Sequence, residues 1–312
     1  KLDSSGNWLW AKNAGGTSND YGYGIAVDAS GNSYVIGNFQ GSATFGSTTL
    51  TSSGGFDIFV AKLDSSGDWK WATKAGGTST DHGFGIAVDA SGNSYVAGHF
   101  KGTATFGDTT LTSSGGYDIF VAKLDSSGNW LWAKNAGGTD GDWGKSIAID
   151  PCGNSYVIGY FNGTATFGST TLTSNGDADI FIAKLDSSGN WLWAKNAGGT
   201  AYERGNCIEV DASGNSYVTG TFGSATATFG STTLTSNGGF DIFITKLDSS
   251  GNWLWAKNAG GTSNDYGYGI AVDASGNSYV IGNFQGSATF GSTTLTSSGG
   301  FDIFVAKLDS SG

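Results

Sequence analysis

Short runs of alternating, β-branched and aromatic residues recur along the chain and predict strands. In the first repeat these runs are 8–14 (WLWAKNA), 24–28 (GIAVD), 32–39 (NSYVIGNF) and 57–63 (DIFVAKL). The second and third runs are joined by a Ser-Gly turn, and the fourth reaches the next Trp-x-Trp run through a similar turn. Glycine suits the left-handed position of such turns, so the pattern predicts two hairpins per repeat. Between the hairpins, we expect Thr44-Phe45 and 48–51 to pair as a small ribbon.

The predicted strands are apolar on both faces. In the run 57–63, Ile58 and Val60 point to one face of the sheet, and Phe59 and Ala61 point to the other. A sheet with one wet face would alternate apolar and polar residues, so these sheets must be covered on both sides, as propeller blades are. We therefore expect the Trp-x-Trp tryptophans to pack between blades.

The hexapeptide Lys-Leu-Asp-Ser-Ser-Gly marks a repeat of 61 or 62 residues. Its six copies divide the chain into 1–61, 62–122, 123–183, 184–245, 246–306 and the partial repeat 307–312. The first and fifth repeats are identical. This periodicity predicts an all-β, five-bladed β-propeller of four-stranded antiparallel blades, forming a single domain over 1–312.

The two chain ends are complementary in sequence. The first repeat has a Trp-x-Trp run with no strand before it to pair with, and the last strand, 301–308, has no such run after it. We expect residues 7–14 to pair with 301–308, which closes the ring and removes exposed sheet edges. We expect a monomer, although the sequence is equally compatible with strands shared between two chains. One of the two terminal turn sequences, 1–6 or 307–312, is then surplus and should fray.

Charge and composition remove several classes of function. The chain has 15 basic and 26 acidic residues and a net charge of −11, so we expect no nucleic-acid partner. No apolar run approaches the roughly 18 residues needed to span a bilayer. Lys1 is the first residue of a repeat, without Met or a signal sequence, which indicates a processed, excised or engineered soluble segment.

Positions at which the repeats differ are the candidates for function. Most lie between a Trp-x-Trp run and the next strand, and a second set lies at the end of the run 32–39 and its equivalents; both emerge on one face of a propeller. We predict a ligand-binding surface at the first set. Its residues are Asp20, Tyr21, Tyr23, Asp81, His82, Phe84, Asp142, Trp143, Lys145, Glu203, Arg204, Asp265, Tyr266 and Tyr268.

A carboxylate beside an aromatic ring suits carbohydrate. The ring stacks on the apolar face of a pyranose, and the carboxylate accepts hydrogen bonds from its hydroxyl groups. Trp143, the one Trp outside the paired runs, is the first choice of anchor. The alternative interpretation is that these are ordinary variable loops whose acids bond backbone N–H groups.

The sequence offers little catalytic chemistry. Its only histidines, His82 and His99, belong to no readable triad or zinc spacing, and we expect no metal and no cofactor. Carboxylate pairs for glycoside hydrolysis remain open. Glu209 should find a partner if it is buried, and Arg204 is the nearest candidate in the sequence. Cys152 and Cys207 lie at opposite ends of neighbouring strands, too far apart for a disulfide, so we expect free thiols.

Several motifs recur in a fixed order in every repeat. The pattern is Asp28-x-x-Gly31-Asn32-x-Tyr34-Val35-x-Gly37, then Phe45-Gly46, then Gly54-Gly55-x-Asp57-x-Phe59-Val60-Ala61-Lys62. It resembles the SBBP β-propeller repeats of bacterial secreted and surface proteins. The resemblance implies an extracellular or cell-surface location and a binding or scaffolding role, with no catalytic signature. The family is thought of as seven-bladed, whereas this chain holds five repeats.

Together these observations predict a non-enzymatic propeller that scaffolds or binds, with carbohydrate or another surface protein as the partner. A purely structural repeat protein, natural or engineered and without a ligand, is the alternative, and the identity of the first and fifth repeats favours it. A glycoside hydrolase ranks last.

Overall fold

The computed structural model describes all 312 residues and contains strands but no helix. The chain forms two compact units, Lys1–Asn135 and Ala136–Gly312, which are described separately. We call each set of consecutive paired strands that corresponds to one repeat a blade.

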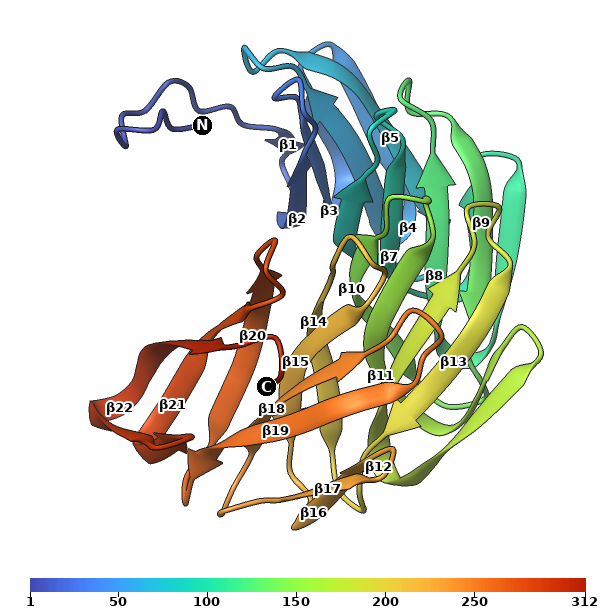
Figure 1. The fold of residues 1–312 in the computed structure, drawn as a ribbon. Coiled ribbons are helices and arrows are strands. Elements are labelled where there is room, and N and C mark those ends of the chain that lie inside the picture. Colours follow the sequence, from blue (N-terminus) through green and yellow to red (C-terminus); the bar gives the residue numbers. More distant parts are fainter. The chain divides into compact units, whose positions relative to one another are not determined.

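The first unit contains two four-stranded antiparallel blades, β2-β3-β4-β5 and β6-β7-β8-β9 (Figure 1). The short strand β1 pairs with β3. The bounds are β1 Gly15–Gly16, β2 Asp20–Val27, β3 Ser33–Phe45, β4 Thr48–Leu63, β5 Trp69–Gly77, β6 His82–Val88, β7 Ser94–Phe106, β8 Thr109–Leu124 and β9 Trp130–Ala136.

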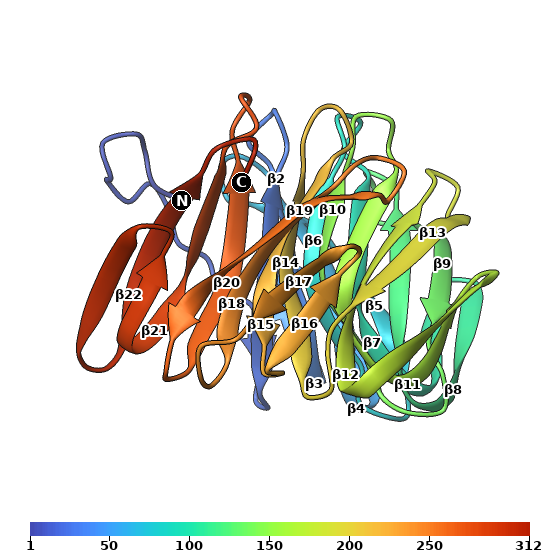
Figure 2. The same cartoon turned by 60° about the horizontal axis from the view of Figure 1, so that its bottom comes forward.

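The second unit contains the four-stranded blades β10-β11-β12-β13 and β14-β15-β18-β19, and the three strands β20-β21-β22 (Figures 1 and 2). Strands β16 and β17 form a separate ribbon beside the second of these blades. The bounds are β10 Asp142–Ile149, β11 Ser155–Phe167, β12 Thr170–Leu185, β13 Trp191–Ala197, β14 Glu203–Val210, β15 Ser216–Phe222, β16 Thr226–Phe229, β17 Thr232–Thr235, β18 Asp241–Leu247, β19 Trp253–Gly261, β20 Asp265–Val272, β21 Ser278–Phe290 and β22 Thr293–Leu308.

The predicted strands are confirmed, with two differences. The second and third strands of a blade run further than expected, because the predicted ribbon continues them: Thr44 pairs with Thr49 and Phe45 with Thr48. A bulge between Gln40 and Ser42 marks the start of this extension. The first Trp-x-Trp run forms no sheet strand, and Trp8 instead makes an isolated bridge with Leu2.

Neighbouring blades of the first unit are joined by a pair of glycines at the end of β5. Gly76 and Gly77 pair with Thr105 and Ala104 at the far end of β7. A Cβ on Gly77 would overlap the backbone carbonyl of Thr103, so only glycine permits this close pairing. The link adds main-chain hydrogen bonds to the side-chain packing between blades.

The apolar faces predicted from the sequence meet between blades. In the first unit, Ile36, Ile58 and Val60 of one blade belong to the same buried cluster as Ile86 and Phe120 of the next. These side chains need a neighbouring blade to leave water, so a single repeat would not bury its own core.

In the Trp-x-Trp runs that form strands, the two tryptophans have different neighbours. The first packs edge-on against a phenylalanine of its own blade, as Trp69 does on Phe45 with ring centroids 5.4 Å apart. The second lies over the glycine of the following turn, and the indole N–H groups of Trp71 and Trp193 donate to carbonyls there, those of Ser126 at 3.1 Å and Ser249 at 3.3 Å. The second tryptophan therefore bridges blades, as expected, while the first closes its own blade.

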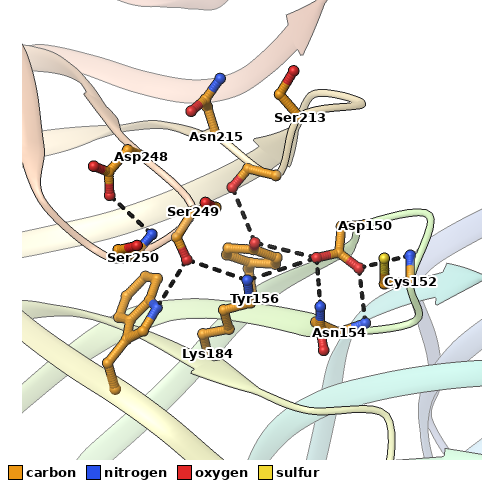
Figure 3. A network of polar contacts seen from close by, with 12 residues as sticks. Asp150, Cys152, Asn154, Tyr156, Lys184, Ser213, Asn215, Asp248, Ser249 and Ser250 are labelled. Atoms are coloured by element: carbon orange, nitrogen blue, oxygen red, sulfur yellow. Dashed lines mark hydrogen bonds and ion pairs between the residues drawn. The ribbon is translucent and has the colours of Figure 1, made fainter.

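At the tight-turn end, blades of the second unit are linked by a buried polar network (Figure 3). The Tyr156 hydroxyl contacts Asp150 Oδ2 at 3.3 Å and donates to the carbonyl of Gly214, in the next blade, at 3.0 Å. Lys184 Nζ lies 3.7 Å from Asp150 Oδ2 and donates to the Ser249 carbonyl at 3.2 Å. The network pairs every buried charge it contains, as a low-dielectric interior requires.

Identical residues differ in burial at the outer blades. Ile58 and Val60 are fully buried, whereas Ile303 and Val305, their equivalents in the identical repeat, are 78% and 70% exposed. In the first unit, Ile25 is 67% exposed while its equivalent Ile86 is buried. Strand β22 is paired on one side only, with β21. Five closed blades are therefore not confirmed, and closure stays a prediction.

Candidate ligand-binding site

The innermost strand of each blade contains a β-bulge at the position where the repeats vary. In β2 the pairing with β3 shifts between Gly22 and Gly24, which leaves Tyr23 as the extra residue. The same shift occurs in β6, β10, β14 and β20. A bulge redirects side chains out of the regular alternation, so it presents varied residues without disturbing the rest of the strand. The extra residues are Tyr23, Phe84, Lys145, Asn206 and Tyr268.

The acidic residues predicted for the site lie beneath this surface and hold the backbone. Asp81 is buried, and its two carboxylate oxygens accept from the N–H groups of Gly77 (2.8 Å) and Lys101 (3.2 Å). Burial raises its pKa to about 6. Similar bonds run from Gly16 to Asp20, Gly138 to Asp142, Gly199 to Glu203 and Gly261 to Asp265. The sequence allowed two roles for these acids, ligand binding and hydrogen bonding to backbone N–H groups. These carboxylates perform the second role.

The predicted aromatic residues of the first unit gather into one cluster. Tyr21 stacks with Tyr23 at a centroid distance of 6.1 Å, and Tyr23 contacts Phe84 of the next blade at 4.7 Å. His82 lies 5.9 Å from Phe84 and 5.1 Å from His99. We call these five residues the Tyr21 cluster. Tyr21 and Tyr23 are 44% and 47% exposed, so their rings can meet a ligand.

The two histidines sit within this aromatic packing. Asn38 Nδ2 lies 2.9 Å from His82 Nδ1, which is hydrogen-bond distance between the amide and the imidazole ring. Tyr117 packs edge-on against His99 at 5.0 Å. No group of three or more His, Cys, Asp or Glu side chains is arranged to hold a metal ion.

The varied residues of β10, β11 and β14 form a second cluster, which we call the Trp143 cluster. Trp143 stacks on Tyr160 with centroids 4.8 Å apart, and Tyr160 contacts Tyr202 at 5.7 Å. The Arg204 guanidinium lies 4.4 Å from the Tyr202 ring centre, and Lys145 Nζ lies 5.7 Å from that of Tyr160. Burial raises the pKa of Tyr160, and burial together with Arg204 lowers the pKa of Lys145.

A third cluster surrounds Tyr266. Tyr268 stacks on it at 6.1 Å with the two rings nearly parallel, at 7°. Phe240 and Phe301 contact the same ring at 5.8 and 5.7 Å. Tyr268 is 53% exposed, so this cluster too reaches the surface.

The sequence prediction omitted several residues that the fold adds to these clusters. They are the aromatic residues that precede the constant aspartate of the third strand, Phe56, Tyr117, Phe240 and Phe301, together with Tyr202. Tyr160 belongs to the second set of varied positions, which the predicted ligand-binding residues did not include. Variation among Phe, Tyr and Ala before that aspartate was the available signal.

Two further expectations concern charged and sulfur groups. The expected Arg204–Glu209 pair is not among the chain's ion pairs. The side chain of Glu209 is exposed, although the surrounding atoms desolvate its carboxyl group and raise its pKa. Cys152 and Cys207 are both free thiols.

Comparison with known proteins tests the resemblance directly. Four segments, 9–38, 70–99, 131–164 and 254–283, match the family model of the SBBP beta-propeller repeat. The chain carries SBBP beta-propeller repeats. Each match begins within a Trp-x-Trp run and extends into the second strand of the following blade, past the bulge. The SBBP repeats thus include the strand that carries the varied residues.

Two curated relatives are similar to the whole chain or nearly so. An uncharacterized WD repeat-containing protein of Acanthamoeba polyphaga mimivirus is 26% identical over 100% of this chain and 28% of its own length. The regulatory protein FlaEY of Caulobacter vibrioides is 27% identical over 93% of this chain and 33% of its own length. The chain therefore spans about a third of each relative.

Solved structures give weaker likenesses. A protein of unknown function from Bacteroides caccae aligns at a TM-score of 0.43 and 13% identity, over 83% of this chain and 71% of its own. A luciferin-regenerating enzyme aligns at a TM-score of 0.37 and 10% identity, over 85% of this chain and 84% of its own.

No helix of the length and apolar character needed to span a membrane is present in the structure.

Proposed function

We propose that this repeat protein is a non-enzymatic binding module and that the three aromatic clusters form its ligand surface. The observation that carries the proposal is the coincidence of sequence variation with aromatic clustering at the bulges of β2, β6, β10, β14 and β20. Core aromatic residues are repeated in every blade, whereas these rings change from blade to blade and several are half exposed. A rigid frame with variable residues at one end is a common design for recognition.

Carbohydrate is the ligand class that this surface favours. Flat, partly exposed rings such as Tyr21, Tyr23 and Tyr268 can stack on the apolar face of a pyranose. The buried acids stiffen the backbone behind the rings, which lowers the entropy cost of binding. The SBBP repeats and the WD repeat-containing and regulatory relatives favour a binding or scaffolding role. We further propose that the chain acts at the surface of a bacterium or outside it.

A glycan array followed by calorimetry tests the proposal. We expect the chain to bind a subset of glycans, and Tyr21→Ala, Trp143→Ala or Tyr266→Ala to weaken binding at least tenfold. Tyr21→Phe and Tyr266→Phe keep the ring and are the matched controls, with expected changes below threefold. A blank array, or equal binding by the alanine variants, would contradict the proposal and favour the purely structural role. Glycan cleavage that is lost on substituting one carboxylate pair would instead indicate a hydrolase.

We also propose that the five blades close into a ring through residues 7–14 and strand β22. In complete blades, the Trp-x-Trp strand pairs with the third strand, as Trp253 does with Leu247, and its first tryptophan packs on a phenylalanine, as Trp253 does on Phe229 at 5.7 Å. Beside β22 no such strand is present, and a cavity of about 370 Å³ is lined by Phe290, Phe304 and Leu308 among others. Trp8 is 77% exposed and has no such phenylalanine partner.

The blade faces support the same closure. The exposed face of β21 and β22, with Ile281, Ile303 and Val305, corresponds to the face of the first blade that packs against Ile86. The exposed Ile25 of β2 is the equivalent of Ile86. Each unit thus leaves uncovered the surface that the other would bury.

A disulfide crosslink tests closure. Ala61 pairs with Ala72 in the complete blade, and Ala11 and Ala306 are the equivalent residues of the proposed blade. With Cys152→Ser and Cys207→Ser as background, we expect Ala11→Cys with Ala306→Cys to form a disulfide within one chain. Ala61→Cys with Ala72→Cys is the positive control, since paired Cα atoms lie about 4.5–5.5 Å apart. Crosslinked dimers, or no crosslink while the control forms one, would refute closure within a monomer.

A further inference from the structure

The Trp143 cluster differs from the other two clusters in its charge. Arg204 is the only arginine of the chain, and its equivalents are Tyr21, His82, Trp143 and Tyr266. Lys145 is the only lysine at the bulge position. Both cations lie over one ring, with Arg204 5.5 Å and Lys145 5.7 Å from the centre of Tyr160. A chain of net charge −11 therefore places two of its few non-repeated cations in one aromatic group.

Arg204 is arranged as a receptor for an anion. Its guanidinium lies over the ring of Tyr202, 4.4 Å from the ring centre, and the side chain is exposed. No carboxylate forms an ion pair with it. The adjacent Glu203 is buried, and it accepts from the N–H of Gly199 and from both the N–H and the hydroxyl of Ser224. The nearest carboxylate in the sequence is thus engaged in holding the backbone.

Lys145 adds a second positive charge behind this fork. Its environment of aromatic rings is poorly hydrated, and both burial and the charge of Arg204 lower its pKa. Two cations held this close repel each other, and a bound anion would relieve that repulsion. Charge interactions are stronger in such a partly desolvated place than on an open surface.

We propose that the Trp143 cluster binds the carboxylate of an acidic saccharide such as a uronic acid. The inference rests on the proposed carbohydrate-binding function and names the ligand class for this one cluster. Arg204 binds the carboxylate through its fork, Lys145 supplies long-range attraction, and Trp143 stacks on the sugar ring. The Tyr21 and Tyr266 clusters lack an equivalent of this cation pair and take neutral sugars.

Calorimetry with oligogalacturonate and its fully methyl-esterified, uncharged form tests this inference. We expect the acid to bind at least tenfold more tightly than the ester at low salt, and the difference to shrink when salt is raised from 50 to 500 mM. Arg204→Gln should abolish the preference, and Arg204→Lys, which keeps the charge without the fork, should retain only part of it. Lys195→Gln removes the same charge from a lysine position that most repeats share, and it should leave the preference intact.

The outcomes separate the two proposals. Equal affinity for acid and ester, or a preference that survives Arg204→Gln, overturns the acidic-saccharide site while leaving carbohydrate binding in place. If neither probe binds and the glycan array is also blank, the binding-module proposal fails, and this inference fails with it. Loss of the preference in Lys195→Gln would show a general charge effect and would also overturn the specific site.

Discussion

The buried hydroxyl of Tyr156 offers a sharp test of how neighbouring blades are held together. It has one proton and lies within hydrogen-bond distance of two acceptors, the Gly214 carbonyl at 3.0 Å and Asp150 Oδ2 at 3.3 Å. Gly214 belongs to the next repeat, so Tyr156→Phe removes a hydrogen bond between blades and changes no apolar contact of the ring. Asp150 keeps its bond from Asn154 Nδ2 at 2.7 Å and its ion pair with Lys184.

The expected cost follows from what is left unpaired. Leaving a buried acceptor without its donor costs about 1–3 kcal/mol, and we take about 2 kcal/mol because Asp150 remains bonded. An unfolding entropy of about 2.1 cal/mol/K per residue, over 312 residues, gives about 0.65 kcal/mol/K. The melting temperature should therefore fall by about 3 °C if the chain unfolds in one transition.

Urea titration and calorimetry measure this change. Tyr21→Phe is the control, because the Tyr21 hydroxyl is at the half-exposed surface and forms no hydrogen bond within the chain, so its removal should change stability by less than about 0.5 kcal/mol. A Tyr156→Phe variant as stable as the wild type would refute the reasoning, since it would mean that the hydroxyl is hydrated or that the blades do not meet there. An unchanged urea m-value would show that the native state, not the unfolded chain, was altered.

Three further predictions concern pH, thiol reactivity and blade closure. Burial raises the pKa of Asp118, Asp179 and Asp241 to about 6. The folded state therefore holds protons that the unfolded chain releases above about pH 4, and stability should fall as pH rises from 4 to 6. Urea titrations at several pH values should show this slope, and Asp179→Asn should flatten it. Cys152 is exposed, whereas burial raises the pKa of the Cys207 thiol, so Ellman's reagent should label one thiol quickly and one slowly, and Cys152→Ser should remove the fast phase. Ile58→Ala should lower the free energy of unfolding by about 2–5 kcal/mol in urea titrations. Ile303→Ala should lower it by as much if the ring closes, but by less than about 0.5 kcal/mol if β22 stays uncovered.

Much of the local architecture could be predicted from the repeat. The strands of the first blade, the Thr44–Thr49 pairing and the two-faced burial of Ile58 and Phe59 all follow from alternation and turn chemistry. The bulge at Tyr23 could not be predicted, because an extra residue in a strand shows only when the partner strand is in register beside it. The same holds for Phe56, which contacts Tyr21 from another strand. Tyr160, by contrast, belongs to the second set of varied positions, which the sequence places on the same face as the first set.

The role of the acids shows why sequence reasoning about the candidate site was incomplete. Asp81 beside His82 suggests a carboxylate available to ligand, yet the fold turns that carboxylate inward to bind two backbone N–H groups. Adjacent residues of a strand point to opposite faces, and only the packed blade decides which face is covered. The residue that follows each acid, an aromatic residue, His82 or Arg204, is therefore the part of the prediction that reaches the surface clusters.

The sequence by itself determined the repeat, the two hairpins in each blade and the position of the varied residues, because these depend on periodicity and on local backbone preferences. Tertiary structure alone decided which rings touch, which carboxylates are buried and which copies of an identical residue meet water. Ile58 and Ile303 make the reason plain: the same side chain in the same local sequence is buried in one place and exposed in the other, since burial depends on the neighbouring blade.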